Sequence, residues 1–358
     1  MSTLAETPPA TNSHPTLTDD PKGPSPFLLL KTPTSSVKIY TFGCHITSFR
    51  TTNLDVNGRT TQSVLASNES ERLWMSSCSE VDGSKPIRGG IPIAFPQFAD
   101  CGDLPLHGFA RNEVWDLIEN SASSGRFQLR ENENTLKVWP FRFTLTYTIR
   151  LVGNKLKLTF EVLNREEVLP FSFSHCLHSY FKVEDIHKVD IYGFDDTKYI
   201  DKCDNKKSKL SNRGDKSDGN IDYYSEGAPS PSAASSLSIQ NEANKSGLEA
   251  NKKGYVDRVY ENHNNQDITL ANVGASTHLH ISQSSSYPQT VLYNPYLGDK
   301  QGPSFPDFDD EGYKHMVCVV STTRSNPQEV IHSCNPRLEF SLSCDKDDPN
   351  TNPPPLVV

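Results

Sequence analysis

The feature that most constrains the fold of this chain is a strict alternation of apolar and polar residues between Phe141 and Val162. Aromatic and aliphatic residues occupy every second position on each side of Gly153-Asn154, and threonine, lysine, arginine or glutamate stand between them. Successive side chains of a β-strand point to opposite faces, so a period of two is typical of a half-buried strand. The run therefore predicts an antiparallel hairpin that turns at Gly153-Asn154 and buries one face.

Shorter segments of the same kind recur along the chain, and none has the spacing of a long amphipathic helix. We expect further strands at Phe27 to Lys31, Val37 to Thr41, Ile46 to Thr51, Leu73 to Ser76, Phe127 to Glu131, Thr290 to Tyr293 and Met316 to Ser321. Many short strands separated by turn residues are typical of an all-β protein, here a β-sandwich or a related antiparallel architecture.

Several segments are too polar to belong to a packed core. Residues 1–25 read as a disordered leader, and residues 346–358 as a loose tail. Residues 204–253 are rich in Ser, Asn, Lys and Gly, and such a composition cannot bury enough apolar surface to offset its ordering entropy. We expect this stretch to be a disordered loop insertion. The length of 358 residues allows one large domain or two ordinary ones.

The charge balance and the cysteines limit the partners and the compartment. The chain carries 35 Lys and Arg against 44 Asp and Glu, a net charge of -9, which argues against nucleic acid or an anionic membrane as the main partner. No apolar run reaches the roughly 18 residues of a membrane span, and the first residues lack the apolar core of a signal peptide. Eight cysteines without a CxxC pair indicate reduced thiols and a cytoplasmic protein.

Two neighbouring loops place cationic side chains among glycines and prolines. They are Lys85-Pro86-Ile87-Arg88-Gly89-Gly90-Ile91-Pro92-Ile93-Ala94-Phe95-Pro96-Gln97-Phe98 and Leu104-Pro105-Leu106-His107-Gly108-Phe109-Ala110-Arg111. Such loops have fixed backbone geometry, and a guanidinium group offers a rigid fork of donors to a phosphate or carboxylate. In an acidic chain, Arg88, His107 and Arg111 therefore predict a small anionic ligand.

The histidines do not predict a metal site. On a regular strand His178 shares a face with Ser174 and Cys176 and lies opposite His175, so the two histidines cannot chelate one ion. His278 and His280 share a face, but no third ligand at suitable spacing accompanies them. Read alone, each histidine of the first pair is a hydrogen-bonded, half-buried side chain.

Two acidic features have an ordinary structural interpretation when they are read alone. Asp257 follows the polar insertion and would be an ion-pair or turn residue. Residues 308–316, FDDEGYKHM, form an acidic turn that would be a solvated loop. The chain has no GxSxG, GxxxxGK[ST] or GxGxxG motif, so nucleotide and dinucleotide chemistry has no support.

Taken in order, six segments resemble the glucose-6-phosphate 1-epimerase branch of the aldose 1-epimerase (galactose mutarotase-like) superfamily. They are KPIRGGIPIAFPQF, LPLHGFAR, LHSYF, VDRVY, NPY and EGYKHMVCV, and the resemblance runs from about Phe27 to Ser343. It implies one large twisted antiparallel β-sandwich over residues 26–345, interrupted by the insertion, with a concave cleft for a hexose 6-phosphate. It also implies a cytoplasmic monomer without cofactor or metal.

The resemblance implies roles for five residues. His178 would be the general acid that protonates the ring oxygen. Arg88 and Arg111 would bind substrate and phosphate, His107 would stand beside the reacting sugar, and Asp257 would bind sugar hydroxyls. Histidine suits proton transfer because it titrates near neutral pH.

The chain departs from the family pattern at two positions. The family's general base is a glutamate directly after MVCV, where this chain has Val320, and a strand would place Val320 on the face of Met316 and Cys318. The loss of a general base typically costs about 10² to 10⁴-fold in rate. Leu106 replaces a glutamine that contacts substrate. A carboxylate at 307, 309, 310 or 311 could act as a substitute.

Three functions stay open at this point. The first is a hexose-6-phosphate mutarotase, weakened by Val320. The second is a sugar-phosphate-binding pseudoenzyme on the same fold. The third is a scaffold whose insertion recruits protein partners.

Overall fold

The structure, a computed structural model, describes the chain in several stretches. They are 15–21, 26–52, 69–202, 207–211, 237–238, 256–261, 267–274, 277–295, 306–323, 330–331 and 337–346. These residues form antiparallel sheets with one short α-helix, α1 (Glu133–Val138), and three 3₁₀ turns. The expected all-β antiparallel architecture is thereby confirmed.

The largest sheet has nine strands. Its order is β15 (Leu237–Ser238), β12 (Asp190–Tyr192), β17 (Ile268–Gly274), β18 (Thr277–Gln283), β22 (Arg337–Lys346), β9 (Lys155–Asn164), β8 (Phe143–Val152), β7 (Ser124–Arg130) and β6 (Asp116–Ser121). The predicted hairpin is β8 and β9, which pair along their whole length from Phe143↔Asn164 to Val152↔Lys155. Gly153 makes the turn with a φ of 58°, which a glycine adopts without strain. The hairpin prediction is confirmed.

The second large sheet has seven strands. Its order is β14 (Lys207–Leu210), β13 (Lys198–Asp201), β16 (Val256–Glu261), β19 (Gln289–Asn294), β20 (Met316–Thr322), β11 (Cys176–Lys182) and β5 (Ile93–Ala94). A third sheet of four strands runs in the order β1 (Phe27–Lys31), β2 (Ser35–Tyr40), β3 (His45–Thr52) and β4 (Glu69–Glu71). A short pair joins β10 (Phe171–Ser172) to β21 (Val330–Ile331).

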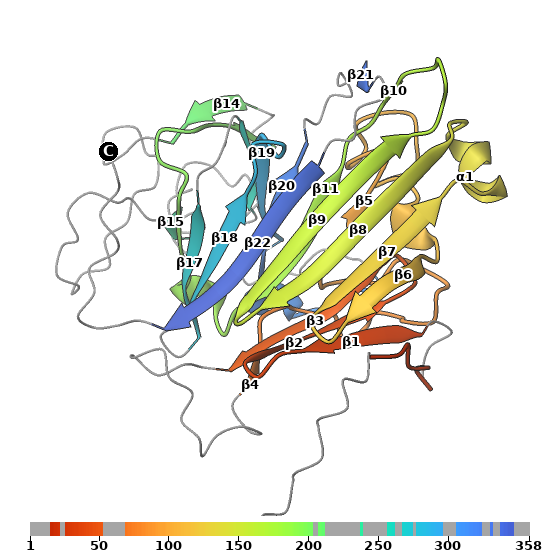
Figure 1. Cartoon of the computed structure of the whole chain (residues 1–358). Helices are drawn as coiled ribbons and strands as arrows, with labels where there is room; N and C mark the ends of the chain where they lie inside the picture. Colours follow the sequence, from red (N-terminus) through yellow and green to blue (C-terminus); the bar gives the residue numbers. More distant parts are fainter. Residues whose placement is uncertain are drawn as a thin grey trace, which may run out of the picture.

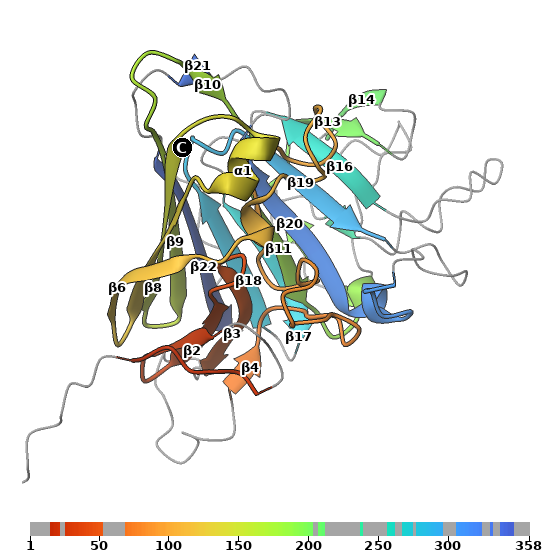
Figure 2. The same ribbon diagram turned by 90° about the vertical axis from the view of Figure 1, so that its right-hand side faces the viewer.

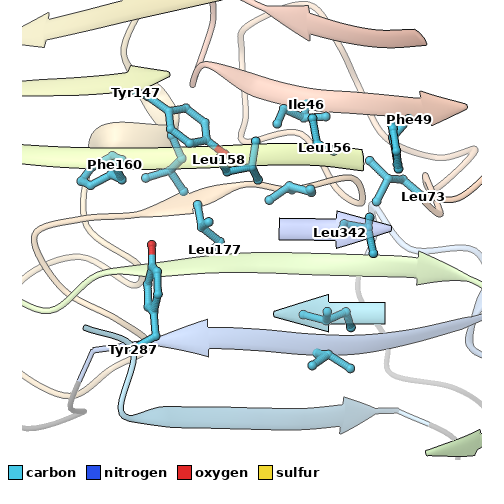
Figure 3. Close-up of a cluster of buried hydrophobic side chains, with 14 of the residues drawn as sticks. Ile46, Phe49, Leu73, Tyr147, Leu156, Leu158, Phe160, Leu177, Tyr287 and Leu342 are labelled. Carbon is cyan, nitrogen blue, oxygen red and sulfur yellow. The ribbon is translucent and has the colours of Figure 1, made fainter. Parts of the chain in front are cut away.

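Figure 1 looks onto the nine-stranded sheet, with β22, β9 and β8 in front. Figure 2, turned by 90°, shows the two large sheets packed face to face, with β8 and β9 on one side and β16, β19 and β20 on the other. The inward-facing side chains of both sheets form one core. Figure 3 shows part of this core, where Phe160 of β9 and Leu177 of β11 lie between the sheets. In the nine-stranded sheet, strands such as β8 and β9 alternate between this core and the outer face, as the sequence period of two predicts.

The seven-stranded sheet is buried on both of its faces. On β20, Val317 and Val319 point into the main core, whereas Met316, Cys318 and Val320 belong to a separate apolar cluster. That second cluster includes Trp74 and Phe308 together with residues of β11, β16 and β19. A strand buried on both faces carries a continuous apolar run, which is why MVCVV does not alternate.

Two segments differ from the sequence-based expectation or extend it. Leu73 to Ser76 is not a strand: Leu73 and Met75 make isolated bridges to Phe181 and Gly89, because the chain here crosses between sheet edges.

The short strands β14 and β15 fall within the range 204–253; most of that range, most of the leader and nearly all of the tail lie outside the described residues. The described residues include no helix that could span a membrane, and α1 has only six residues.

Two histidines of the interior predict how stability depends on pH. Burial lowers the pKa of His45 to about 4 and that of His175 to about 3. The unfolded chain therefore binds more protons than the native protein as the pH falls below about 6.5, so acid destabilises the fold.

We expect the free energy of unfolding to fall by about 1 kcal/mol per buried histidine between pH 7 and pH 5.5. Urea denaturation at the two pH values measures it, and His175→Gln should remove one histidine's share of the difference. An unfolding free energy that is equal at both pH values would contradict these protonation states.

Candidate active site

The two predicted glycine-rich loops cross the edge of the seven-stranded sheet, and two glycines allow them to do so. Gly90 has a φ of 63°, and a Cβ there would lie 2.1 Å from the Ile46 carbonyl oxygen. Gly108 has a φ of 67°, and a Cβ there would lie 2.1 Å from the Phe95 carbonyl oxygen. Only glycine fits at such positions, so the loop path that carries Arg88, His107 and Arg111 follows from the sequence.

His178 lies on β11 directly opposite Val320 on β20. The same register continues from Val320 to Val291 on β19 and then to Val259 on β16. The expected placement of Val320 on the face of Met316 and Cys318 is thus observed, and cross-strand neighbours of this kind have Cβ atoms about 5 Å apart. Val320 is only 1% exposed, so it is part of a packed apolar row beside His178.

A row of polar side chains runs parallel to this apolar row. The strand pairing brings Asp257 of β16 opposite Tyr293 of β19, Tyr293 opposite Cys318 of β20, and Cys318 opposite Tyr180 of β11. Asp257 and Tyr180 therefore lie on the same face, three strands apart, or roughly 14 Å. The sheet itself joins residues that are far apart in the sequence.

His107 stands next to His178 as a neutral imidazole. The two rings meet edge to face with centroids 5.7 Å apart. The backbone N–H of Ala99 donates to His107 Nδ1 at 3.2 Å, so the ring proton is on Nε2. Burial and the charges of Arg111, Arg88 and Lys202 lower the pKa of His107 to about 3. His107 can therefore donate a hydrogen bond from Nε2 without carrying charge.

His178 is held by ring contacts and has an unused polar atom. Its imidazole stacks on Tyr180 with centroids 4.7 Å apart. Burial lowers its pKa well below the usual range, and His107, Arg88 and Arg111 lower it further. Among the described residues its buried Nδ1 has no hydrogen-bond partner. A buried polar group without a partner is unfavourable, so this atom is suited to a ligand.

Arg88 is bound on one side by a carboxylate. This carboxylate is that of Asp307, which directly precedes the acidic turn at 308–316 and is counted with it from here on. Asp307 Oδ2 accepts from Nε at 3.0 Å and Oδ1 accepts from Nη2 at 3.3 Å. Nη1 lies 3.4 Å from the Tyr180 hydroxyl. The guanidinium thus joins the acidic turn to the stacked pair of Tyr180 and His178.

Arg111 has fewer partners than Arg88. Its Nη2 donates to the Leu106 carbonyl oxygen at 2.8 Å, and its buried Nε has no partner among the described residues. Burial lowers its pKa, and the charge of Arg88 lowers it further. Two cations are thus held near one another with a free donor, which is the electrostatic arrangement of an anion site.

Asp257 and Lys202 form an ion pair at the far end of the polar row. Lys202 Nζ lies 3.6 Å from Asp257 Oδ1. Burial raises the pKa of Asp257, and Lys202 opposes this rise. The ion-pair interpretation of Asp257 from the sequence is therefore correct, and the residue also faces the same side of the sheet as His178.

The acidic residues of the turn contact different partners. Asp307 reaches Arg88, whereas Asp309 accepts from the backbone N–H of Ser77 at 2.9 Å and from its hydroxyl. Glu311 pairs with Lys314, and Asp310 is exposed. At the other departure from the family pattern, the Leu106 side chain is 57% exposed and faces solvent beside Arg111.

Sequence reasoning missed Tyr180, Lys202 and Tyr293. The alternation of β11 could have placed Tyr180 on the face of His178, but nothing local indicates that Lys202 pairs with Asp257.

His278 and His280 lie on β18 with ring centroids 6.4 Å apart, and the described residues contain no cluster of three or more potential metal ligands. A hollow of about 690 Å³ lies elsewhere, on the outer face of the nine-stranded sheet, and none of the predicted site residues lines it.

Comparison with known proteins gives a consistent result. The family described as aldose 1-epimerase matches residues 26–333. A protein of Escherichia coli K12 named "Putative glucose-6-phosphate 1-epimerase" is 30% identical over 280 residues, which cover 76% of this chain and 80% of that protein. A protein of the same name from Cenchrus ciliaris is 28% identical over 328 residues, covering 85% and 84%.

The fold is also similar to that of solved structures. A crystal structure titled as a putative mutarotase (YeaD) from Salmonella typhimurium superposes with a TM-score of 0.66 and 23% identity, covering 90% of this chain and 91% of that one. At that identity the likeness concerns the fold alone.

Proposed function

Since the chain belongs to the aldose 1-epimerase family, we propose that it binds a hexose 6-phosphate and interconverts its α and β anomers. The observation that carries this proposal is the convergence of Arg88, Arg111, His107 and His178 on one face of a sheet. Two buried nitrogens there, Arg111 Nε and His178 Nδ1, have no partner among the described residues. A phosphate on Arg111 and a sugar ring oxygen at His178 would satisfy both.

The chemistry is acid–base ring opening. His178 protonates the ring oxygen as a base removes the proton of the anomeric hydroxyl, and the C1–O5 bond breaks to give the aldehyde. Rotation about C1–C2 and the reverse transfers close the other anomer. No cofactor is required, because every step is a proton transfer or the opening or closing of a hemiacetal.

The bound phosphate has a second effect in this proposal. Burial and nearby cations keep His178 neutral, and a neutral imidazole is a weak acid. A phosphate dianion beside Arg88 and Arg111 offsets those cations and raises the pKa of His178. Substrates without phosphate lack this activation, so the proposal favours phosphorylated over free hexoses.

A second candidate is a sugar-phosphate-binding protein without turnover. The observation that favours it is Val320, which places an apolar side chain directly opposite His178 where the family pattern has a glutamate. The exposed Leu106 beside Arg111 adds to it.

Wild type and Val320→Glu distinguish the two functions. For a mutarotase we expect wild type to exchange glucose 6-phosphate anomers clearly above the spontaneous rate, as magnetisation-exchange NMR measures. For a binding protein, wild type stays at the spontaneous rate and Val320→Glu raises it by about 10²-fold or more. Calorimetry supplies the control that both proteins bind the sugar phosphate, since a buried carboxylate at 320 also costs stability.

A further inference from the structure

A proton acceptor for this reaction must be a carboxylate or another base that reaches the face of His178. The outward-facing side chains of β20 in this region, Met316, Cys318 and Val320, cannot serve as an ionised base here: the first and last do not titrate, and burial raises the pKa of the Cys318 thiol well above its usual value. In the acidic turn, Asp309 and Glu311 are held by Ser77 and Lys314. Asp307 is the member of this turn that contacts a residue of the site.

The position of Asp307 is fixed by its neighbours. Phe308 is buried and its ring lies 4.8 Å from that of Trp74, which stacks on Tyr180 at 5.9 Å. Gly312 closes the turn against the same indole, where a Cβ would lie 2.6 Å from the ring. The bond from Ser77 to Asp309 holds the other side of the turn. These contacts hold the turn in place and so fix the position of Asp307 next to Arg88.

The ion pair with Arg88 orients the carboxylate and leaves it accessible. Both oxygens of Asp307 accept from one edge of the guanidinium, at 3.0 and 3.3 Å, and the two side chains are each 28% exposed. Each carboxylate oxygen has a further lone pair. Through Arg88 and Tyr180 the carboxylate is connected to the stacked ring of His178.

Asp257 is a further carboxylate on this face, but it lies on a strand remote from that of His178. It lies on β16, across β19 and β20 from the strand of His178, and it pairs with Lys202. An acid and a base that act on adjacent oxygens of one sugar must lie close to each other, and three strand spacings amount to roughly 14 Å.

We propose that Asp307 is the catalytic base of this site, a proposal that rests on the proposed function. Its carboxylate accepts the proton of the anomeric O1 hydroxyl while the C1–O5 bond breaks. The O1–H electron pair forms the C1=O1 double bond, and O5 takes the C1–O5 pair and a proton from His178. In closure, O5 returns its proton to His178 and attacks C1, and O1 recovers its proton from Asp307. No proton or electron is gained or lost over the cycle.

The test compares Asp307→Asn with Asp310→Asn, which removes the same charge from an exposed position of the same turn. Asparagine can still accept from Arg88 Nε but cannot take a proton. We expect Asp307→Asn to lower kcat for anomer exchange by about 10² to 10⁴-fold with KM changed less than threefold, and Asp310→Asn to match wild type. Asp307→Ala should recover part of its rate in formate, which supplies a small carboxylate.

The outcomes separate this assignment from the proposed function. If wild type exchanges anomers and Asp307→Asn does so equally well, the assignment to Asp307 is overturned and the mutarotase stands. If Asp307→Asn raises KM at unchanged kcat and formate restores nothing to Asp307→Ala, Asp307 only positions Arg88, and the assignment is overturned. A wild-type rate equal to the spontaneous rate overturns both.

Discussion

Replacing His178 with glutamine should lower the rate of glucose 6-phosphate anomer exchange by about 10² to 10⁴-fold, the typical contribution of general acid–base catalysis. Glutamine keeps a polar group next to Tyr180 and Val320 but cannot transfer a proton. Because the proposed function assigns binding mainly to the arginines, the affinity for the sugar phosphate should change only a few-fold. Magnetisation-exchange NMR gives the rate and calorimetry gives the affinity.

The matched control is His280→Gln, on the outward-facing side of β18, where His280 contacts Thr269. That variant should retain the wild-type rate. A His178→Gln protein that exchanges anomers as fast as wild type would show that the reaction does not use this imidazole.

Replacing Arg111 with glutamine should weaken the binding of glucose 6-phosphate by about 10- to 150-fold and leave the weak binding of glucose almost unchanged. Arg88 is already engaged by Asp307, so Arg111 is the cation with a donor to spare, and charge-assisted hydrogen bonds contribute roughly 1.5–3 kcal/mol each. The free protein should be no less stable than wild type, because the substitution removes a buried charge next to Arg88.

Arg130→Gln removes the same charge from an exposed position of β7 and serves as the control. Calorimetric titration of both variants with glucose 6-phosphate and with glucose gives the four affinities. Equal losses for the two sugars would mean that Arg111 acts on the ring or the loop and not on the phosphate.

The sheet register could be predicted where one face of a strand is buried and the other is solvated. The hairpin of β8 and β9 follows from the alternation of Phe141 to Val162, since a shift of one residue would expose every apolar side chain. The apolar run at Met316 to Val320 indicated a strand, but not which of its faces belongs to the main core. Both faces are covered, and the cover comes from Trp74 and Phe308.

The proposed site residues stand in recognisable motifs, but their partners could not be predicted from the sequence. Arg88, Arg111 and His178 stand in segments with recognisable spacing, and glycines 90 and 108 fix the path of their loops. Asp307 pairs with Arg88 across 219 residues of sequence. Such a contact depends on the packing of a turn against Trp74, which no local pattern encodes.

The most direct test of the account is a crystal structure of the protein with glucose 6-phosphate. We expect a phosphate oxygen within about 2.9 Å of Arg111 Nε and the sugar ring beside His178, with the anomeric hydroxyl directed toward Asp307. A sugar phosphate bound instead in the hollow on the outer face of the nine-stranded sheet, near Arg150 and Lys157, would contradict it.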